Sequence, residues 1–271
     1  MARDMRRLLS FSCEGAMLGA TLDDAAGTTG LLLVTGGSQT RIGSHRMYER
    51  LAKGLSKNNI PCFRFDRRGV GDSSGDDPGF RGSAPDLTAA AAAFRAEASA
   101  LTRLYGFGLC DGASAIALFG DTAGLDGLIL VNPWLVEAEA GAPPAAAVRA
   151  HYRQQLTSWS GWKKLLTGAV DFGKLWRGLI RILRGSDPSL AQDIAAALRR
   201  HRLPVQLILA KDDATAIAAE VEMKSKCFSD LKPDIQTLDT DSHTFARPGD
   251  EAALLAAVED ALASLSAKPS P

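Results

Sequence analysis

A cysteine flanked by glycines, at the end of an apolar run, constrains the fold of this chain more than any other feature. The run 104–109 leads into Gly108-Leu-Cys-Asp-Gly112, and small residues in a helical pattern follow. This is the G-x-Nuc-x-G pattern of a nucleophile elbow, a sharp turn between a strand and a helix. Side chains two positions before and after the strained central residue would collide, which favours glycine at both. The pattern predicts that Cys110 is presented at a helix N-terminus, where backbone N–H groups favour a thiolate.

Strand-like apolar runs alternate with helical patterns along most of the chain. Strands are predicted at 30–35, 60–65, 104–109, 125–131, 204–210 and 234–238, with a hairpin at 8–13 and 16–22. Helices are predicted at 44–55, at 83–103, after the elbow, at 216–228 and at 251–265. Ser44 and Ser83 are the predicted N-caps of the first two helices, and Asp86 completes a capping box with Ser83. The alternation predicts a mostly parallel, doubly wound α/β sheet with right-handed crossovers.

The alternation stops between 134 and 201, where the pattern is helical. We therefore expect one α/β core formed by 1–133 and 202–271, with an inserted helical cap at 134–201. Within the expected cap, 162–184 sets six basic residues and a single acid, Asp171, against an apolar face. This segment is either a cap whose basic side is solvated, or a surface for peripheral contact with an anionic membrane or anionic substrate.

Composition excludes several classes of function. The 271 residues carry 31 basic and 31 acidic side chains, so a general nucleic-acid binder is not expected. The four cysteines are scattered without a CxxC pair and the four histidines show no paired spacing, so we expect no disulfide framework, no metal and no cofactor. Cys13, Cys62 and Cys227 are expected to be inert packing residues. With no signal peptide and no membrane-spanning run, a cytoplasmic protein is the expectation.

A nucleophilic Cys110 needs a base, and the base needs an acid that orients it. In a doubly wound sheet, both lie in loops at the carboxyl ends of strands. The strand at 205–210 runs directly into Asp212 and Asp213, and the loop after the last strand contains His243. Asp213 is the preferred acid and Asp212 the second choice, whereas Asn132, after the preceding strand, cannot serve. The order nucleophile, acid, histidine is the one found in α/β-hydrolases.

The same reasoning gives candidates for the oxyanion hole, the N–H groups that hold the negative oxygen of a tetrahedral intermediate. One is the N–H of Asp111, directly after the nucleophile, and the other belongs to the loop that follows the strand at 30–35. Gly37 is the first choice there and Ser38 the second, because glycine allows a substrate to approach the backbone closely.

Two other interpretations of the elbow compete with this one. Cys110 could be an ordinary buried core residue, since cysteine is among the most buried residue types. The glycines at 106–112 could also form a dinucleotide-binding loop, but no acidic residue ends the next strand to bind a ribose. His45 and His201 are expected to be surface or capping residues.

Over essentially its full length the chain resembles an α/β-hydrolase. Asp66-Arg-Arg-Gly-Val-Gly-Asp-Ser73 resembles the D-x-R-G-x-G-x-S loop common in that superfamily. More narrowly, the stretches at 36–46 and 108–114 are similar to those of exosortase A system-associated hydrolases of the first type. That resemblance implies a bacterial, cytoplasmic protein linked to exopolysaccharide and protein-sorting functions. The cysteine departs from the serine that most of the superfamily has at the elbow.

Together these features predict an α/β-hydrolase fold with an inserted cap and a Cys110–His243–Asp213 triad. The predicted activity is hydrolysis of a small ester or thioester, with esterase or thioesterase character. The alternatives are an acyltransferase that uses a sugar or other hydroxyl acceptor, and a non-catalytic partner protein that retains the fold. A location at the inner membrane would follow if 162–184 binds anionic lipid.

Overall fold

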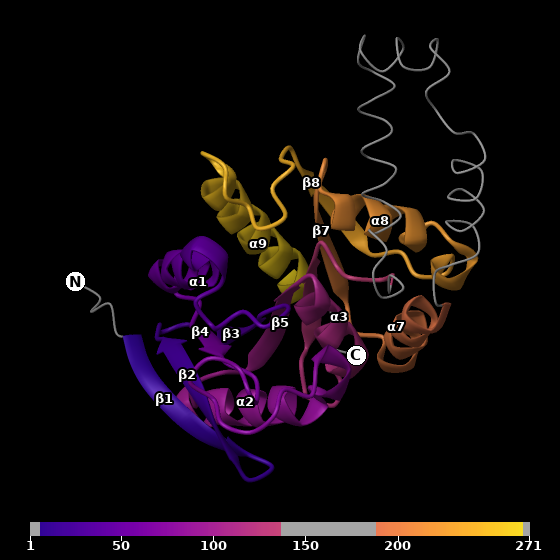
Figure 1. The fold of residues 1–271 in the computed structure, drawn as a ribbon. Coiled ribbons are helices and arrows are strands. Elements are labelled where there is room, and N and C mark those ends of the chain that lie inside the picture. The colour runs from indigo at the N-terminus through magenta and orange to yellow at the C-terminus, as the bar shows by residue number, and fades with distance from the viewer. Residues whose placement is uncertain (1–5, 137–187, 268–271) are drawn as a thin grey trace, which may run out of the picture.

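The computed structural model describes residues 6–136 and 188–267, which form one twisted sheet covered by helices on both faces (Figure 1). In the described ranges the sheet has eight strands in the order β1-β2-β4-β3-β5-β6-β7-β8. The first three strands in this order pair antiparallel, and every pair from β4 to β8 is parallel. The strands are β1 (Arg6–Cys13), β2 (Ala16–Asp23), β3 (Thr29–Val34), β4 (Cys62–Phe65), β5 (Arg103–Leu109), β6 (Gly127–Val131), β7 (Val205–Ala210) and β8 (Asp234–Leu238).

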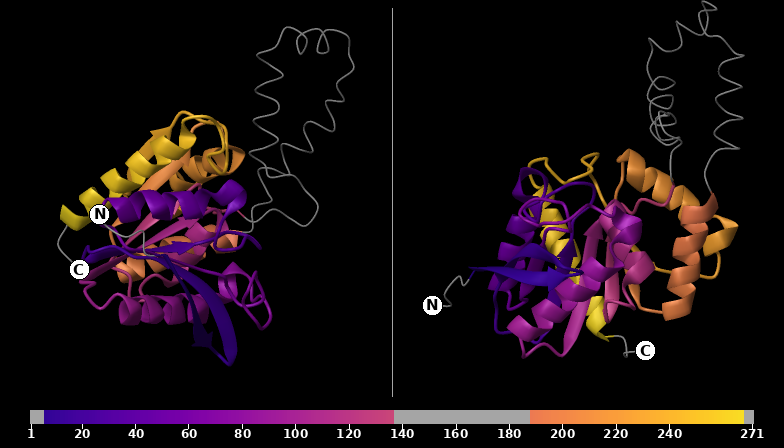
Figure 2. Two further views of the ribbon diagram at one scale, coloured as in Figure 1. Left: turned by 90° about the vertical axis from the view of Figure 1, so that its left-hand side faces the viewer. Right: turned by 60° about the horizontal axis from the view of Figure 1, so that its bottom comes forward.

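Helices cover both faces of the sheet, as the two views of Figure 2 show. Helices α1 and α9 pack on one face, and α2, α3, α7 and α8 pack on the other. The described helices are α1 (Met47–Lys57), α2 (Ala84–Glu97), α3 (Asp111–Phe119), α7 (Pro188–His201), α8 (Ala214–Met223) and α9 (Asp250–Ala267), with 3-10 turns at Ser44–Arg46, Phe80–Gly82 and Lys226–Phe228. This confirms the predicted mostly parallel, doubly wound sheet.

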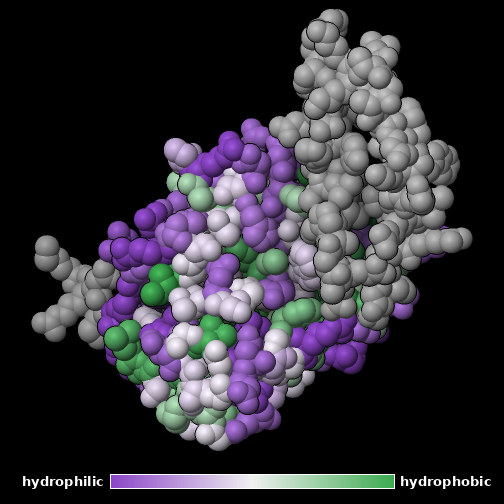
Figure 3. Space-filling view, in the orientation of Figure 1, coloured by the Kyte–Doolittle hydropathy of each residue, from purple (hydrophilic) through white to green (hydrophobic). Residues whose placement is uncertain are grey.

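The central strands are apolar throughout because both of their faces are buried. In β3, Leu31 and Leu33 belong to the core shared with α1 and α9, whereas Leu32 and Val34 belong to the core shared with α2 and α3. Cys13 and Cys62 lie buried in these two cores, as expected for inert packing residues. Polar groups dominate the outer surface seen in Figure 3, with apolar residues interspersed among them.

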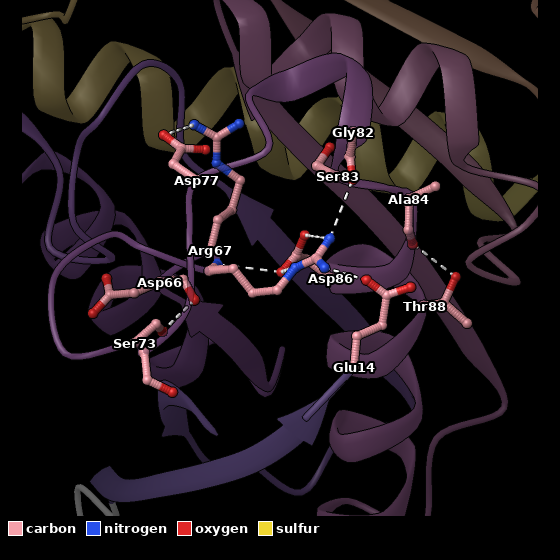
Figure 4. Close-up of polar contacts among 12 residues, drawn as sticks. Glu14, Asp66, Arg67, Ser73, Asp77, Gly82, Ser83, Ala84, Asp86 and Thr88 are labelled. Atoms are coloured by element: carbon pink, nitrogen blue, oxygen red, sulfur yellow. Dashed lines mark hydrogen bonds and ion pairs between the residues drawn. The ribbon is translucent and has the colours of Figure 1, made fainter. Parts of the chain in front are cut away.

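Of the two predicted helix caps, the one at Ser44 is wrong, whereas Ser83 does stand at the N-cap of α2 but without the predicted capping box. Ser44 lies in a 3-10 turn, and its N–H donates to the side chain of Gln39, so α1 begins three residues later. Ser83 does precede α2, but its side chain makes no capping bond. Asp86 is fully buried and binds the guanidinium of Arg68 instead of completing a capping box (Figure 4).

The glycine-rich loop at 66–75 joins β4 to α2 and is held by ion pairs to arginines, in which the acids Asp66 and Asp86 are buried. Asp66 accepts from the backbone and side chain of Arg41. Arg68 bridges Asp86 and Glu14, both of which are labelled in Figure 4. The loop therefore fixes the hairpin β1–β2 to the rest of the sheet. This gives the motif at 66–73 a structural role.

Most of the expected cap lies outside the described residues, including all of 162–184. Of 134–201, the structure describes 134–136 and helix α7. Helix α7 buries Leu190, Ile194 and Leu198 in the same core as α3. The extent of the cap stays a prediction.

Candidate active site

Cys110 stands at the turn between β5 and α3, with φ 59° and ψ −125°. These angles lie in a region that L-residues seldom adopt, as expected at a strained elbow. A Cβ added to Gly108 would stand 2.5 Å from the backbone N of Ala113, and one added to Gly112 would stand 2.5 Å from the carbonyl oxygen of Val34. Both glycines are therefore required by close contact between backbones. The side chain of Cys110 is partly exposed at the N-terminus of α3.

A buried tyrosine ties the elbow to the neighbouring strand. The hydroxyl of Tyr48 donates to Val34 O at 2.9 Å and accepts from the N–H of Leu109 at 3.2 Å. It therefore joins the carboxyl ends of β3 and β5 directly beside Cys110. Burial raises the pKa of Tyr48, so the hydroxyl stays protonated. In the sequence, Tyr48 stands at helical spacing with Leu51 and Leu55, a pattern that indicates only packing.

The structure places Asp213 and His243 together, from the loops after β7 and β8. Asp213 Oδ2 lies 3.1 Å from His243 Nδ1 and also accepts the N–H of Ala216 at 2.8 Å. Asp213 is thereby the N-cap of α8 and is nearly buried. Asp212 is exposed, and its backbone N–H bonds to Thr240 O. Of the two carboxylates considered, Asp213 is the one that contacts the imidazole.

The surroundings of His243 favour its protonated form. Its pKa is raised to about 10, chiefly by the hydrogen bond with Asp213, followed by the interaction with Cys110, against the opposing effect of burial. An imidazole between a carboxylate and a thiol is the arrangement that stabilises a thiolate–imidazolium pair. The structure thus places the imidazole of His243 against Asp213, and Cys110 is among the groups that raise the pKa of that imidazole.

Asn132 belongs to the site, although the sequence analysis only excluded it as the acid that orients the histidine. Its Nδ2 donates to His243 O at 3.1 Å, and its Oδ1 accepts from Ala210 N at 2.8 Å. It is fully buried with φ 42°, a left-handed conformation that asparagine tolerates better than most residues. Asn132 therefore links the ends of β6 and β7 to the loop that carries His243.

Three more polar residues shape the His243 loop. Thr240 donates its hydroxyl to Asp250 Oδ2 at 2.7 Å and accepts the N–H of Ser242 at 3.1 Å. His45 Nε2 lies 2.8 Å from Thr244 O, so this exposed histidine contacts the residue after His243. The surface location expected for His45 is correct, although sequence gave no sign of this contact.

His201 has the capping role expected of it. Its Nδ1 accepts the N–H of Leu203 at 3.1 Å, just after α7 ends, and its Nε2 lies 3.1 Å from Ala117 O. Burial lowers the pKa of His201. It therefore belongs to the packing of α7 on α3.

The oxyanion-hole candidates lie beside the elbow, but they are not all free. Gly37 N–H donates to the Asp111 side chain, Oδ1, at 2.5 Å. The carbonyl of Gly37 accepts from the guanidinium of Arg67. Within the described part of the chain, the backbone N–H groups of Ser38 and Asp111 have no hydrogen-bond acceptor. Asp111 is in the first turn of α3, where helix N–H groups lack partners.

The described residues include no cluster of three or more acidic, histidine or cysteine side chains that could hold a metal ion. Within the same part of the chain, no helix is both long and apolar enough to cross a membrane.

Comparison with solved structures shows how widely this fold recurs. Est1E from Butyrivibrio proteoclasticus with bound ferulic acid superposes with a TM-score of 0.66 at 16% identity, covering 96% of this chain and 100% of the other. The alpha/beta hydrolase GrgF from Penicillium sp. sh18 gives 0.63 at 19% identity, with coverage of 97% and 100%. The Pyrococcus furiosus esterase Pf2001 gives 0.61 at 14% identity, with coverage of 94% and 92%. At these identities the likeness concerns the fold alone.

In sequence, the comparison with curated proteins finds no match. Residues 31–259 match the Alpha/beta hydrolase family. This span runs from β3 into α9 and includes the elbow, Asp213 and His243. The chain therefore belongs to the alpha/beta hydrolase family.

Proposed function

We propose that the protein hydrolyses a small ester or thioester through a Cys110–His243–Asp213 triad. The observation that carries the proposal is the position of His243. It is hydrogen-bonded to Asp213 at 3.1 Å, and its interaction with Cys110 contributes to its raised pKa. A strained, partly exposed cysteine beside an oriented imidazole is the arrangement that nucleophilic catalysis requires.

In the first half-reaction the thiol proton of Cys110 passes to His243, whose cation is stabilised by Asp213. The thiolate attacks the acyl carbonyl, and a C–S bond forms as the carbonyl electrons move onto oxygen. Backbone N–H groups of Asp111 and of the loop at 37–38 hold this oxyanion. When the intermediate collapses, the alcohol or thiol leaves with the proton from His243, and an acyl-Cys110 thioester remains.

In the second half-reaction His243 takes a proton from water, and the resulting hydroxide attacks the thioester. Collapse of this intermediate breaks the C–S bond and releases the carboxylic acid, and His243 gives its proton to the sulfur, which restores the thiol of Cys110. An acceptor hydroxyl in place of water would make the same steps an acyl transfer. Adding a sugar acceptor and looking for an acylated product separates the two reactions.

The proposal is tested by intact-mass spectrometry after incubation with a panel of acyl-thioesters and p-nitrophenyl esters. We expect one acyl adduct on Cys110 in the wild type, and loss of both adduct and turnover in Cys110→Ala. The matched control is Cys227→Ser, which removes the other partly exposed cysteine among the described residues. Undiminished turnover in Cys110→Ala contradicts the mechanism. If the wild type forms no adduct on Cys110 and hydrolyses no ester of the panel, the alternative of a non-catalytic partner protein is favoured.

We also infer a setting for this activity from sequence alone. The resemblance to exosortase-associated hydrolases supports a bacterial, cytoplasmic enzyme linked to exopolysaccharide pathways. The six basic residues of 162–184, which lie outside the described residues, support peripheral contact with anionic lipid. Liposome flotation tests this contact: we expect binding to anionic vesicles at low salt, and absence of binding contradicts it.

A further inference from the structure

Two charged side chains hold the backbone of Gly37 from opposite sides. Its N–H donates to Asp111 Oδ1 at 2.5 Å, and its carbonyl accepts from Arg67 Nη2. Both bonds involve an ionic group, and such hydrogen bonds are stronger than those between neutral groups. The N–H that was the first choice for binding an oxyanion is therefore occupied by a carboxylate.

The carboxylate of Asp111 also stands beside the proposed nucleophile. A methyl group placed on Gly36 would be 2.5 Å from Asp111 Oδ1 and 3.3 Å from Cys110 Cβ. A tetrahedral intermediate on Cys110 would put its negative oxygen near this carboxylate. Oxyanion stabilisation depends on donors aimed at the developing charge, so a negative group on one of these donors opposes the reaction.

Arg67 holds the carbonyl side of Gly37, opposite the N–H that Asp111 accepts. Its side chain is 3% exposed, and Asp77 Oδ2 lies 4.0 Å from its Nη2. Within the described residues its Nη1 has no hydrogen-bond partner. Figure 4 shows Arg67 beside Asp77. In a trans peptide the C=O and the following N–H point in opposite directions. The bond from Arg67 to the Gly37 carbonyl therefore also sets the direction of the Ser38 N–H.

We propose that Asp111 closes the oxyanion hole of the resting protein. Its carboxylate competes with the acyl carbonyl for the Gly37 N–H, and acylation requires the carboxylate to turn away. Arg67 is a positioning residue that holds the Gly37–Ser38 peptide for the incoming oxygen. This inference rests on the proposed function, because it concerns the oxyanion formed when Cys110 is acylated.

The test compares two reactions of the same thiol. Acylation by p-nitrophenyl butyrate passes through an oxyanion, whereas alkylation by iodoacetamide forms the S–C bond by direct displacement without one. Both rates are followed on the Cys110 peptide by mass spectrometry in the wild type, Asp111→Asn and Asp111→Ala. The ratio of acylation to alkylation cancels any change in thiolate reactivity and reports on the oxyanion hole.

We expect the ratio to rise in the order wild type, Asp111→Asn, Asp111→Ala. Asparagine can still accept the Gly37 N–H but carries no charge, whereas alanine frees the N–H. Freeing one oxyanion donor should raise the ratio about tenfold or more. Glu220→Gln, an exposed acid on α8 paired with Lys224, is the matched control for removal of one charge and should leave the ratio unchanged. Arg67→Lys in the Asp111→Ala background should reduce the gain.

An unchanged or lower ratio of acylation to alkylation in both Asp111 variants overturns the inference. If Arg67→Lys does not lower the ratio in the Asp111→Ala background, the positioning role of Arg67 is overturned. If the wild type acylates Cys110 and the Asp111 variants are no faster, the inference fails while the proposed function stands. If Cys110 is alkylated but acylated in none of these proteins, the proposed function fails as well. Circular dichroism of each variant establishes that it is folded.

Discussion

The two sides of the candidate site are held in place by different means. The elbow side, from β5 to α3, is fixed by close packing of backbones, with Gly108 and Gly112 where a Cβ would stand 2.5 Å from main-chain atoms. The acid–histidine side, after β7 and β8, is fixed by hydrogen bonds from side chains such as Asn132 and Thr240. Close packing tolerates almost no added volume, whereas a hydrogen-bonded loop loses its geometry gradually as single bonds are removed.

The largest effect should come from adding one methyl group to the elbow side. In Gly112→Ala the new Cβ would meet Val34 O at 2.5 Å and the Thr35 carbonyl group at 2.9 Å, so β3 and α3 must move apart. We expect the free energy of unfolding to fall by about 3 kcal/mol or more, as for other overpacked sites. Urea denaturation measures it.

Gly124→Ala is the control for this substitution. Gly124 has φ 67° with nothing within 4 Å of an added Cβ, so only backbone strain is introduced, at a cost of about 1–2 kcal/mol. Equal losses of stability in the two variants would contradict the view that contact between backbones fixes the elbow.

On the acid–histidine side, Asn132→Asp should have an intermediate effect. Aspartate retains an oxygen for the N–H of Ala210 and tolerates the left-handed backbone, but it cannot donate to His243 O. We expect the free energy of unfolding to fall by about 1–3 kcal/mol, the cost of an unsatisfied buried acceptor. Because His243 is displaced, ester turnover should fall by about tenfold.

A positioning role is distinguished from a purely structural one by a kinetic measurement. Loss of stability alone leaves kcat of the folded fraction intact, so kcat is measured well below the unfolding temperature of Asn132→Asp. Thr240→Val removes a bond farther from the imidazole, between the hydroxyl and Asp250, and serves as comparison. If Thr240→Val lowers kcat as much as Asn132→Asp, a specific role for Asn132 is contradicted.

The contrast between the two sides also explains which parts of the site were predictable from sequence. Backbone contact leaves a local signature, because glycine is needed at fixed offsets from Cys110. The acid and histidine were predicted because parallel strands end at one edge of the sheet, and the direct contact with His243 comes from Asp213, the first choice. Alternation of apolar runs likewise gave the strands to within a few residues.

The residues whose side chains hold the site by hydrogen bonds leave no comparable pattern in the sequence. Tyr48 follows a helical apolar spacing, and nothing in its neighbours indicates that its hydroxyl joins β3 to β5. The capping predictions failed in part because other hydrogen bonds override local preference: the N–H of Ser44 donates to Gln39, and Asp86 binds Arg68 instead of completing the box at Ser83. The contact of Asp111 with Gly37 joins residues 74 positions apart and could not be predicted from either segment.

The smallest effect should be the pH dependence that His243 contributes to stability. Its folded-state pKa of about 10 lies above the value of about 6.5 for an unfolded histidine, so the folded protein binds the proton more tightly. The stabilisation is therefore fully present below about pH 6.5 and is lost as pH rises through about 10. Because a third of the side chain is exposed and solvent screens the interaction, we expect about 1 kcal/mol rather than the full linkage value. Urea unfolding of the wild type and His243→Gln at about pH 6 and about pH 10 measures it: the difference in stability between the two proteins should shrink at the higher pH. A difference that stays constant, or grows with pH, would show that the Asp213–His243 contact does not depend on the imidazolium. The acid–histidine side would then be held only by neutral hydrogen bonds such as those of Asn132 and Thr240.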